Sequence, residues 1–140
     1  MSGEDVKLQY LSKEWIDEVI KRVKASLTAE EMKHVSSSMV NIVENCPDGT
    51  TRHMYFRFEN GLLAEALVGT SDDEVASREA EFRIIGEYDT FAKISRAELG
   101  ARSALMRNKI KLKGNMVKAL RLSSVVDKLN KIIATVPTDY

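Results

Sequence analysis

An alternating stretch that runs into a tight-turn signal, at residues 52–61, most constrains what this chain can fold into. In RHMYFRFENG an apolar side chain recurs at every second position from Met54 to Phe58, which is the period of a strand with one buried face. The Asn60-Gly61 pair that follows is the strongest short signal for a two-residue hairpin loop. The sequence therefore predicts an antiparallel pair in which residues 62–68 return alongside the first strand.

Helical spacing precedes this hairpin. Residues 13–26 place apolar side chains on one face and acid-before-base pairs on the other, and Ser12 is a candidate N-cap. Thr28 and Glu31 form a capping-box pattern, which predicts that a second, short helix begins there.

The elements after the hairpin alternate between the two periods, beginning with a polar connection over residues 70–81 that has room for one helical turn. The predicted strands are residues 39–44, 81–86 and 109–113. Three helices are also predicted: one begins at Asp89 or Thr90, and the others are residues 101–107 and residues 115–134. The last helix is either continuous or divided at Ser123-Ser124.

This order of elements indicates the α+β class, with one mostly antiparallel sheet of five strands covered on one face by helices. A chain of 140 residues suits one domain, which we place at residues 12–140 after an N-terminal extension of residues 1–11. The long C-terminal helix needs an apolar surface to cover. The sheet offers one made by Met54, Phe56, Phe58, Phe82, Ile84, Ile110 and Leu112.

Composition narrows the function classes. Acidic and basic residues balance at 21 each, so no global field attracts nucleic acid or an anionic membrane. The one cysteine, Cys46, excludes an internal disulfide and fits a reducing compartment. No basic-then-apolar leader, membrane-length apolar run or targeting tripeptide is visible, which predicts a cytoplasmic protein.

Candidate catalytic and metal-binding groups are scarce. His34 and His53 lie far apart without cysteine or carboxylate at ligand spacing, and His53 is expected on the solvated face of the sheet. Cys46 lies in a turn without a basic partner, which indicates an unreactive thiol. Glu79 and Glu81 are expected to be solvated rather than an acid–base pair. The sequence therefore predicts no catalytic residue, no cofactor and no metal site.

Three lysines, Lys109, Lys111 and Lys113, alternate along the last predicted strand and allow two interpretations. A nucleic-acid surface would carry interleaved aromatics or a pI above about 9. The stretch has no aromatic residue and the sequence pI is about 6.7. Lysines on an edge strand also block pairing between sheets, and this second interpretation is favoured over nucleic-acid binding.

The segments FRFENG, AEFRIIGEYDTFAKI and ALMRNKIKLKGNMVKALRL resemble, in this order, the sterol carrier protein 2 family of sterol-binding domains. The resemblance runs from about residue 12 to the C-terminus. Family members often have Pro where this chain has Gly100-Ala101, and Gly where it has Asn108, a residue that also tolerates left-handed backbone. The ending Thr-Asp-Tyr differs from the peroxisomal tripeptide of many eukaryotic members.

The resemblance implies five strands and about five helices that enclose a hydrophobic tunnel. It implies binding and carriage of a lipid ligand, such as a fatty acid, fatty acyl-CoA, phospholipid or sterol, without catalysis. The side chains expected to line the tunnel are Phe56, Phe58, Phe82, Ile84, Leu105, Met106, Ile110, Leu112, Met116, Leu120, Val126 and Leu129.

An alternative from another class is a protein interaction or dimerisation module of the same fold. Under either hypothesis the chain is a monomer or a homodimer, makes at most transient membrane contact and binds no nucleic acid.

Overall fold

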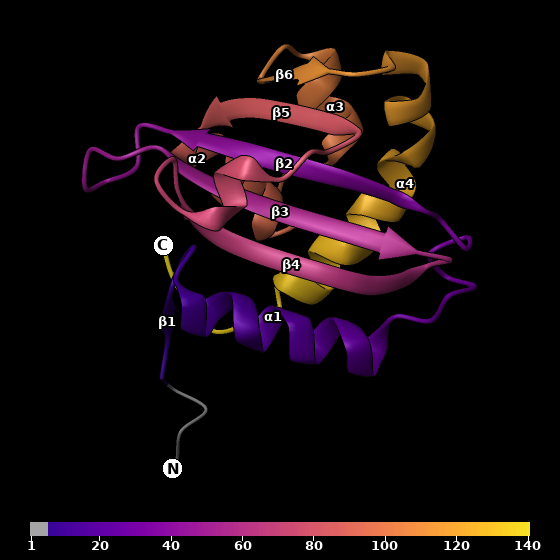
Figure 1. The fold of residues 1–140 in the computed structure, drawn as a ribbon, viewed down its shortest axis with the longest axis horizontal. Coiled ribbons are helices and arrows are strands. Elements are labelled where there is room, and N and C mark those ends of the chain that lie inside the picture. Colours follow the sequence, from indigo (N-terminus) through magenta and orange to yellow (C-terminus); the bar gives the residue numbers. More distant parts are fainter. Residues whose placement is uncertain (1–5) are drawn as a thin grey trace.

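The computed structural model describes residues 6–140, as one five-stranded sheet with helices packed on one side (Figure 1). Residues 1–5 of the expected N-terminal extension lie outside the described part. The strands are β2 (Ser37–Glu44), β3 (Arg52–Glu59), β4 (Leu62–Thr70), β5 (Phe82–Glu87) and β6 (Ile110–Lys113). Their order is β4-β3-β2-β5-β6, and only the β2–β5 pair is parallel. The predicted α+β fold with a mostly antiparallel five-stranded sheet is confirmed.

The described chain has four α-helices rather than about five: α1 (Lys13–Ser26), α2 (Tyr88–Ser95), α3 (Ala101–Met106) and α4 (Met116–Ile133). The predicted cap of α1 forms, because Ser12 accepts a hydrogen bond from the Trp15 amide. Asn115, expected as the first residue of the last helix, is instead the N-cap of α4 and accepts a hydrogen bond from the Lys118 amide. α4 runs unbroken through the two serines, since Ser123 Oγ donates to the Leu120 carbonyl within the helix.

The helix predicted at Thr28 is wrong, although its capping box forms. The Thr28 amide donates to Glu31 Oε1 and the Glu31 amide donates to Thr28 Oγ1, each at 3.1 Å. Lys33 and His34 then adopt left-handed backbone, at φ of 54° and 50°, which ends the turn before a helix can extend. The predicted caps of α2 are also wrong, because that helix already begins at Tyr88 after Glu87. Asn108 has the left-handed backbone expected of it, at φ of 57°.

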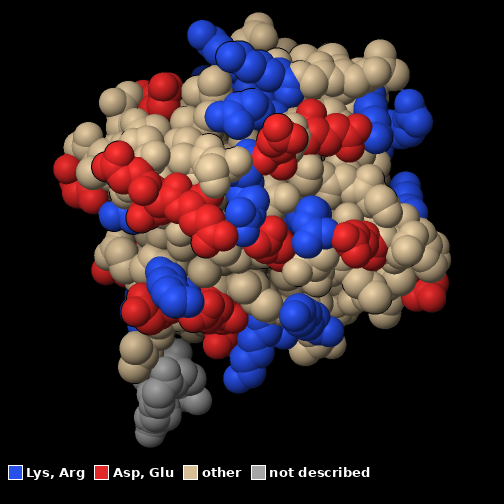
Figure 2. Space-filling view, in the orientation of Figure 1, with Lys and Arg blue, Asp and Glu red and all other residues tan. Residues whose placement is uncertain are grey.

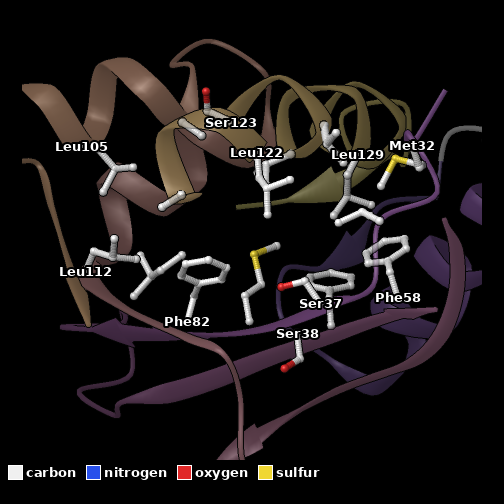
Figure 3. A pocket seen from close by; sticks show the side chains of 18 of the residues that line it. Met32, Ser37, Ser38, Phe58, Phe82, Leu105, Leu112, Leu122, Ser123 and Leu129 are labelled. Atoms are coloured by element: carbon white, nitrogen blue, oxygen red, sulfur yellow. The ribbon is translucent and has the colours of Figure 1, made fainter. Parts of the chain in front are cut away.

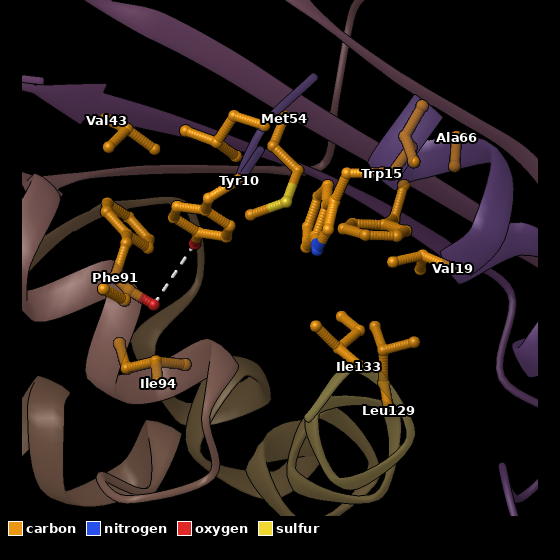
Figure 4. Close-up of a cluster of buried hydrophobic side chains, with 14 of the residues drawn as sticks. Tyr10, Trp15, Val19, Val43, Met54, Ala66, Phe91, Ile94, Leu129 and Ile133 are labelled. Atoms are coloured by element: carbon orange, nitrogen blue, oxygen red, sulfur yellow. Dashed lines mark hydrogen bonds between the residues drawn. The ribbon is translucent and has the colours of Figure 1, made fainter. Parts of the chain in front are cut away.

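The chain ends meet in a small parallel pair that sequence analysis missed, β1 (Leu8–Gln9) with β7 (Thr138–Asp139). The next residue, Tyr10, is 3% exposed. Its hydroxyl donates to the Phe91 carbonyl at 3.3 Å and hydrogen-bonds Ser95 Oγ at 2.7 Å (Figure 4). Burial raises the pKa of Tyr10 far above its usual value. Residues 8–11 therefore join the core of the domain.

The face of the sheet opposite the helices is partly covered, contrary to expectation. The polar connection after β4 forms a 3₁₀ turn, η2 (Glu74–Ser77), whose Val75 packs with Val40 and Tyr55 in a second, small core. His53 on the same face is 8% exposed instead of solvated. Burial, and then the charge of Arg83, lowers its pKa. The sequence pattern indicated the face of each side chain but not the loop that folds over it.

Tyr10 provides a test of how far the N-terminal segment supports the domain. Tyr10→Ala removes a buried ring and leaves Ser95 without its partner, so we expect the free energy of unfolding to fall by about 3–5 kcal/mol. Val6→Ala is the control, because Val6 is 63% exposed and its change should stay within about 0.5 kcal/mol. Urea unfolding measures both, and a loss below about 1 kcal/mol for Tyr10→Ala would contradict the placement.

Candidate functional site

A cavity of about 90 Å³ lies between the sheet and α4 (Figure 3). The residues that line it come from the turn after α1, four strands, α3 and α4, and none of them is charged. The sheet side is built by direct cross-strand neighbours: Phe56 of β3 pairs with Met39 of β2, and Met39 pairs with Phe82 of β5. Because such neighbours lie on one face of a sheet, the register alone produces an apolar floor.

The edge strand β6 extends this floor with one of its faces. Ile110 and Leu112 line the cavity, and Leu112 pairs directly with Ile84 of β5. Lys111 and Lys113 alternate with them and are exposed on the other face. The edge position predicted for the lysine strand is confirmed by the strand order.

The polar groups of the wall are engaged outside the cavity. Ser38 Oγ accepts from the Glu81 amide at 2.9 Å, and Ser123 Oγ donates to the Leu120 carbonyl at 2.7 Å. Both hydroxyls point away from the cavity in Figure 3. Ser37 Oγ donates to the Glu81 carboxylate. The described wall therefore presents apolar surface to an occupant.

The helix α4, which forms the roof of the cavity, is buried unevenly along its length. From Met116 to Leu122 no residue is buried, whereas Val125, Leu129 and Ile133 in the second half are 4%, 1% and 1% exposed. The second half is also tied to α3, because the Asp127 carboxylate accepts from the Ala101 amide at 3.0 Å. The second half of α4 anchors the helix, and the first half covers the cavity loosely.

One ion pair connects the first half of α4 to the sheet. Lys118, in the first turn of α4, donates to the carboxylate of Glu81, which precedes β5. This contact and the hydrogen bond from Ser37 lower the pKa of Glu81. Both side chains are more than a third exposed, so the ion pair is a weak one.

Most of the side chains expected to line a tunnel lie at this cavity. Nine of the twelve border it: Phe56, Phe58, Phe82, Ile84, Leu105, Ile110, Leu112, Val126 and Leu129.

Three of the expected lining residues do not border the cavity. Met106 is 64% exposed, because successive helix residues point about 100° apart and Leu105 takes the inward position. Met116 is the first residue of α4 and is 45% exposed. Leu120 is half-buried and packs against the main core instead.

The remaining lining residues were missed: Met32, Val35, Ser37, Ser38, Met39, Ala101, Ala119, Leu122, Ser123 and Val125. The alternation of β2 contained a signal for Met39, and the helical spacing of α4 contained one for Leu122 and Val125. Serine and alanine carry no such signal, since only the tertiary packing decides which of them face the cavity.

The residues weighed as metal ligands or as a reactive thiol can be placed in the described part of the chain. Within residues 6–140, no three His, Cys, Asp or Glu side chains lie together in a way that could hold a metal ion. Cys46 is buried, and its burial raises the pKa of the thiol. Over the same residues, no helix is both long and apolar enough to cross a bilayer.

Comparison with known proteins identifies the family. The model of the SCP-2 sterol transfer family matches residues 16–127, which include most of the cavity wall. The chain belongs to this family. A sequence search of curated proteins found no match.

Solved structures show the same fold at low identity. A conserved hypothetical protein from Thermus thermophilus aligns over 94% of this chain and 92% of its own, with 18% identity and a TM-score of 0.76. A crystal structure of sterol carrier protein 2 aligns over 91% and 99%, with 19% identity and a TM-score of 0.75. Palmitated sterol carrier protein 2-like 2 from Aedes aegypti aligns over 82% and 94%, with 18% identity and a TM-score of 0.57.

The ion pair between Glu81 and Lys118 predicts that the stability of the fold depends on pH. A carboxyl with a lowered pKa stabilises the fold above its usual value of about 4.3, and this contribution disappears as the pH falls through the lowered pKa. We expect Glu81→Gln to lower the melting temperature by about one to four degrees at pH 7 and to match the unchanged protein at a pH below the lowered pKa.

Glu79→Gln is the control, because Glu79 is exposed and forms no ion pair within residues 6–140. It should leave the melting temperature unchanged at both pH values. A Glu81→Gln difference that persists at low pH would show that the effect is not ionic.

Proposed function

We propose that this protein binds the acyl chain or another long apolar part of a lipid in the cavity beneath α4 and carries it without chemical change. The observation that carries this proposal is the wall itself, in which every hydroxyl is engaged elsewhere and no charge is present. Membership of a sterol transfer family supports the proposal, and so does the palmitate of the Aedes aegypti protein of the same fold.

The free energy gained by burying an acyl chain and the cost of association are compatible with reversible binding. Each methylene removed from water contributes about 0.8 kcal/mol, so a 16-carbon chain gains up to roughly 13 kcal/mol. Association and ordering cost about 4–15 kcal/mol. Since these terms are similar, the fit between the apolar chain and the cavity decides the affinity.

The cavity has to widen for such a ligand. Its volume of about 90 Å³ is well below the roughly 300–1,000 Å³ of small-molecule pockets. The sheet is fixed by its hydrogen bonds and the second half of α4 by its burial. The first half of α4, residues 116–122, is the part of the wall with no buried residue, so we infer that it moves outward when lipid enters.

Leu122 offers a direct test, because its side chain points from α4 into the cavity (Figure 3). Leu122→Trp adds volume where space is empty. We expect binding of a fluorescent fatty acid to weaken tenfold or more, about 1.4 kcal/mol, while the melting temperature of the lipid-free protein stays level or rises.

Met106→Trp is the matched control, since it introduces the same ring at an exposed position outside the cavity. It should leave both fatty-acid binding and melting temperature unchanged. If Leu122→Trp instead costs roughly 1–3 kcal/mol of stability, the site is closely packed core and the cavity assignment fails there.

Hydrogen exchange tests the movement of the roof. In lipid-free protein we expect amides of residues 116–122 to exchange faster than those of residues 125–133, because no residue in the first half of α4 is fully buried. Added palmitate should slow the exchange of residues 116–122 tenfold or more, while β3 amides stay unchanged. Equal exchange along α4 with and without palmitate would contradict a mobile roof.

A further inference from the structure

The charges of this chain are balanced in number but not in position. Residues 99–126 contain seven basic residues and no acidic one, so the rest of the chain carries a formal excess of seven negative charges. The seven are Arg102, Arg107, Lys109, Lys111, Lys113, Lys118 and Arg121. The segment comprises α3, β6 and the first half of α4, which lie together at one end of the molecule (Figure 1). We name this end the basic end.

The positive charge of the basic end is largely uncompensated. Lys118 pairs with Glu81, but within residues 6–140 none of the other six side chains forms an ion pair. Arg83 of β5 even stands directly opposite Lys113 of β6, an arrangement that destabilises a sheet. Figure 2 shows basic side chains gathered over β6 at the upper edge of the molecule. Blocking an open strand edge does not require this many unpaired charges.

Exposed apolar side chains accompany these charges. Five large hydrophobic residues are exposed in the described chain, and three of them lie in the basic end: Met106, Met116 and Val117, at 64%, 45% and 70%. Met116 and Val117 are adjacent at the start of α4, between Lys113 and Lys118. Apolar side chains flanked by lysine are the chemistry of segments that lie in a membrane interface.

We propose that the basic end docks on membranes that contain anionic lipids, with Lys109, Lys111 and Lys113 on the headgroups and Met116 and Val117 inserted among them. The acidic remainder of the chain is repelled, so the charge asymmetry also orients the protein on the surface. Nucleic acid fits less well, because bases stack on aromatic side chains and residues 99–126 contain none.

This docking would bring the cavity to the membrane. Leu112, Ala119 and Leu122 line the cavity from β6 and α4, and each is partly exposed at the basic end. The loosely seated half of α4 would thus face the headgroups. The proposal goes beyond lipid binding in the cavity, because an unloaded protein should dock equally well.

Vesicle co-sedimentation of the full-length, lipid-free protein tests the proposal. We expect binding to phosphatidylcholine vesicles with about 30% phosphatidylserine, none to phosphatidylcholine alone, and release at about 0.5 M NaCl. The combined change Lys109→Gln, Lys111→Gln and Lys113→Gln should weaken binding on the order of a hundredfold. The control, Lys21→Gln, Lys24→Gln and Lys93→Gln, alters three exposed lysines outside the basic end and should stay within about threefold.

A second pair of variants separates insertion from charge. Met116→Ser with Val117→Ser keeps every charge and should weaken binding about tenfold, whereas Leu62→Ser, at an exposed position on the β3–β4 hairpin, should have no effect. This pair remains informative if removal of the edge lysines causes aggregation.

Several outcomes would overturn the proposal. They are absence of binding to anionic vesicles, equal binding to neutral vesicles, equal loss in the two lysine variants, no effect of the Met116 and Val117 changes, and tighter salt-sensitive binding to single-stranded RNA than to vesicles. Fatty-acid uptake is measured separately, so failure of docking leaves lipid binding in the cavity intact.

Discussion

The structure depends on how one helix of 18 residues covers the apolar face of the sheet. The second half of α4 packs into the main core, where Leu129 and Ile133 lie close to Trp15 and Val19 of α1 (Figure 4). The first half packs less closely, with Leu120 only half-buried against the same core, and the cavity lies beneath it. The buried second half therefore anchors α4 on the core, and the first half extends from it over the cavity.

The short strand β6 shows how one segment serves two surfaces. Its alternation places Ile110 and Leu112 toward the cavity and Lys111 and Lys113 toward solvent. The same period-two pattern therefore builds part of the apolar floor and part of the basic end. The proposed binding and docking sites are adjacent because alternating residues of the same strand face the cavity and the solvent.

The sequence predicted those parts of the fold that local chemistry decides. The hairpin at Asn60-Gly61, the cap Ser12 and the alternation of β3 depend on neighbours in the chain, and the structure agrees with them. The parallel pairing of β1 with β7 could not be predicted, since two-residue strands carry no period and join chain ends. Nine of the lining residues expected from the family resemblance border the cavity, but Met106 does not, because the inward direction of a six-residue helix depends on its packing against α4.

A lipid carrier has to release the lipid that it binds, so the contacts that close its cavity have to be weak. None of residues 116–122 is fully buried, and the side chains of the Lys118–Glu81 ion pair are more than a third exposed, where an ion pair contributes about 0.2–1 kcal/mol. Moving this part of α4 therefore costs little, while the buried half of α4 and the buried, hydrogen-bonded Tyr10 keep the fold intact. Strong closure would slow both entry and release, because α4 has to move before a lipid can pass in either direction. The loose packing of the first half of α4 is thus what the proposed reversible carriage of a lipid requires.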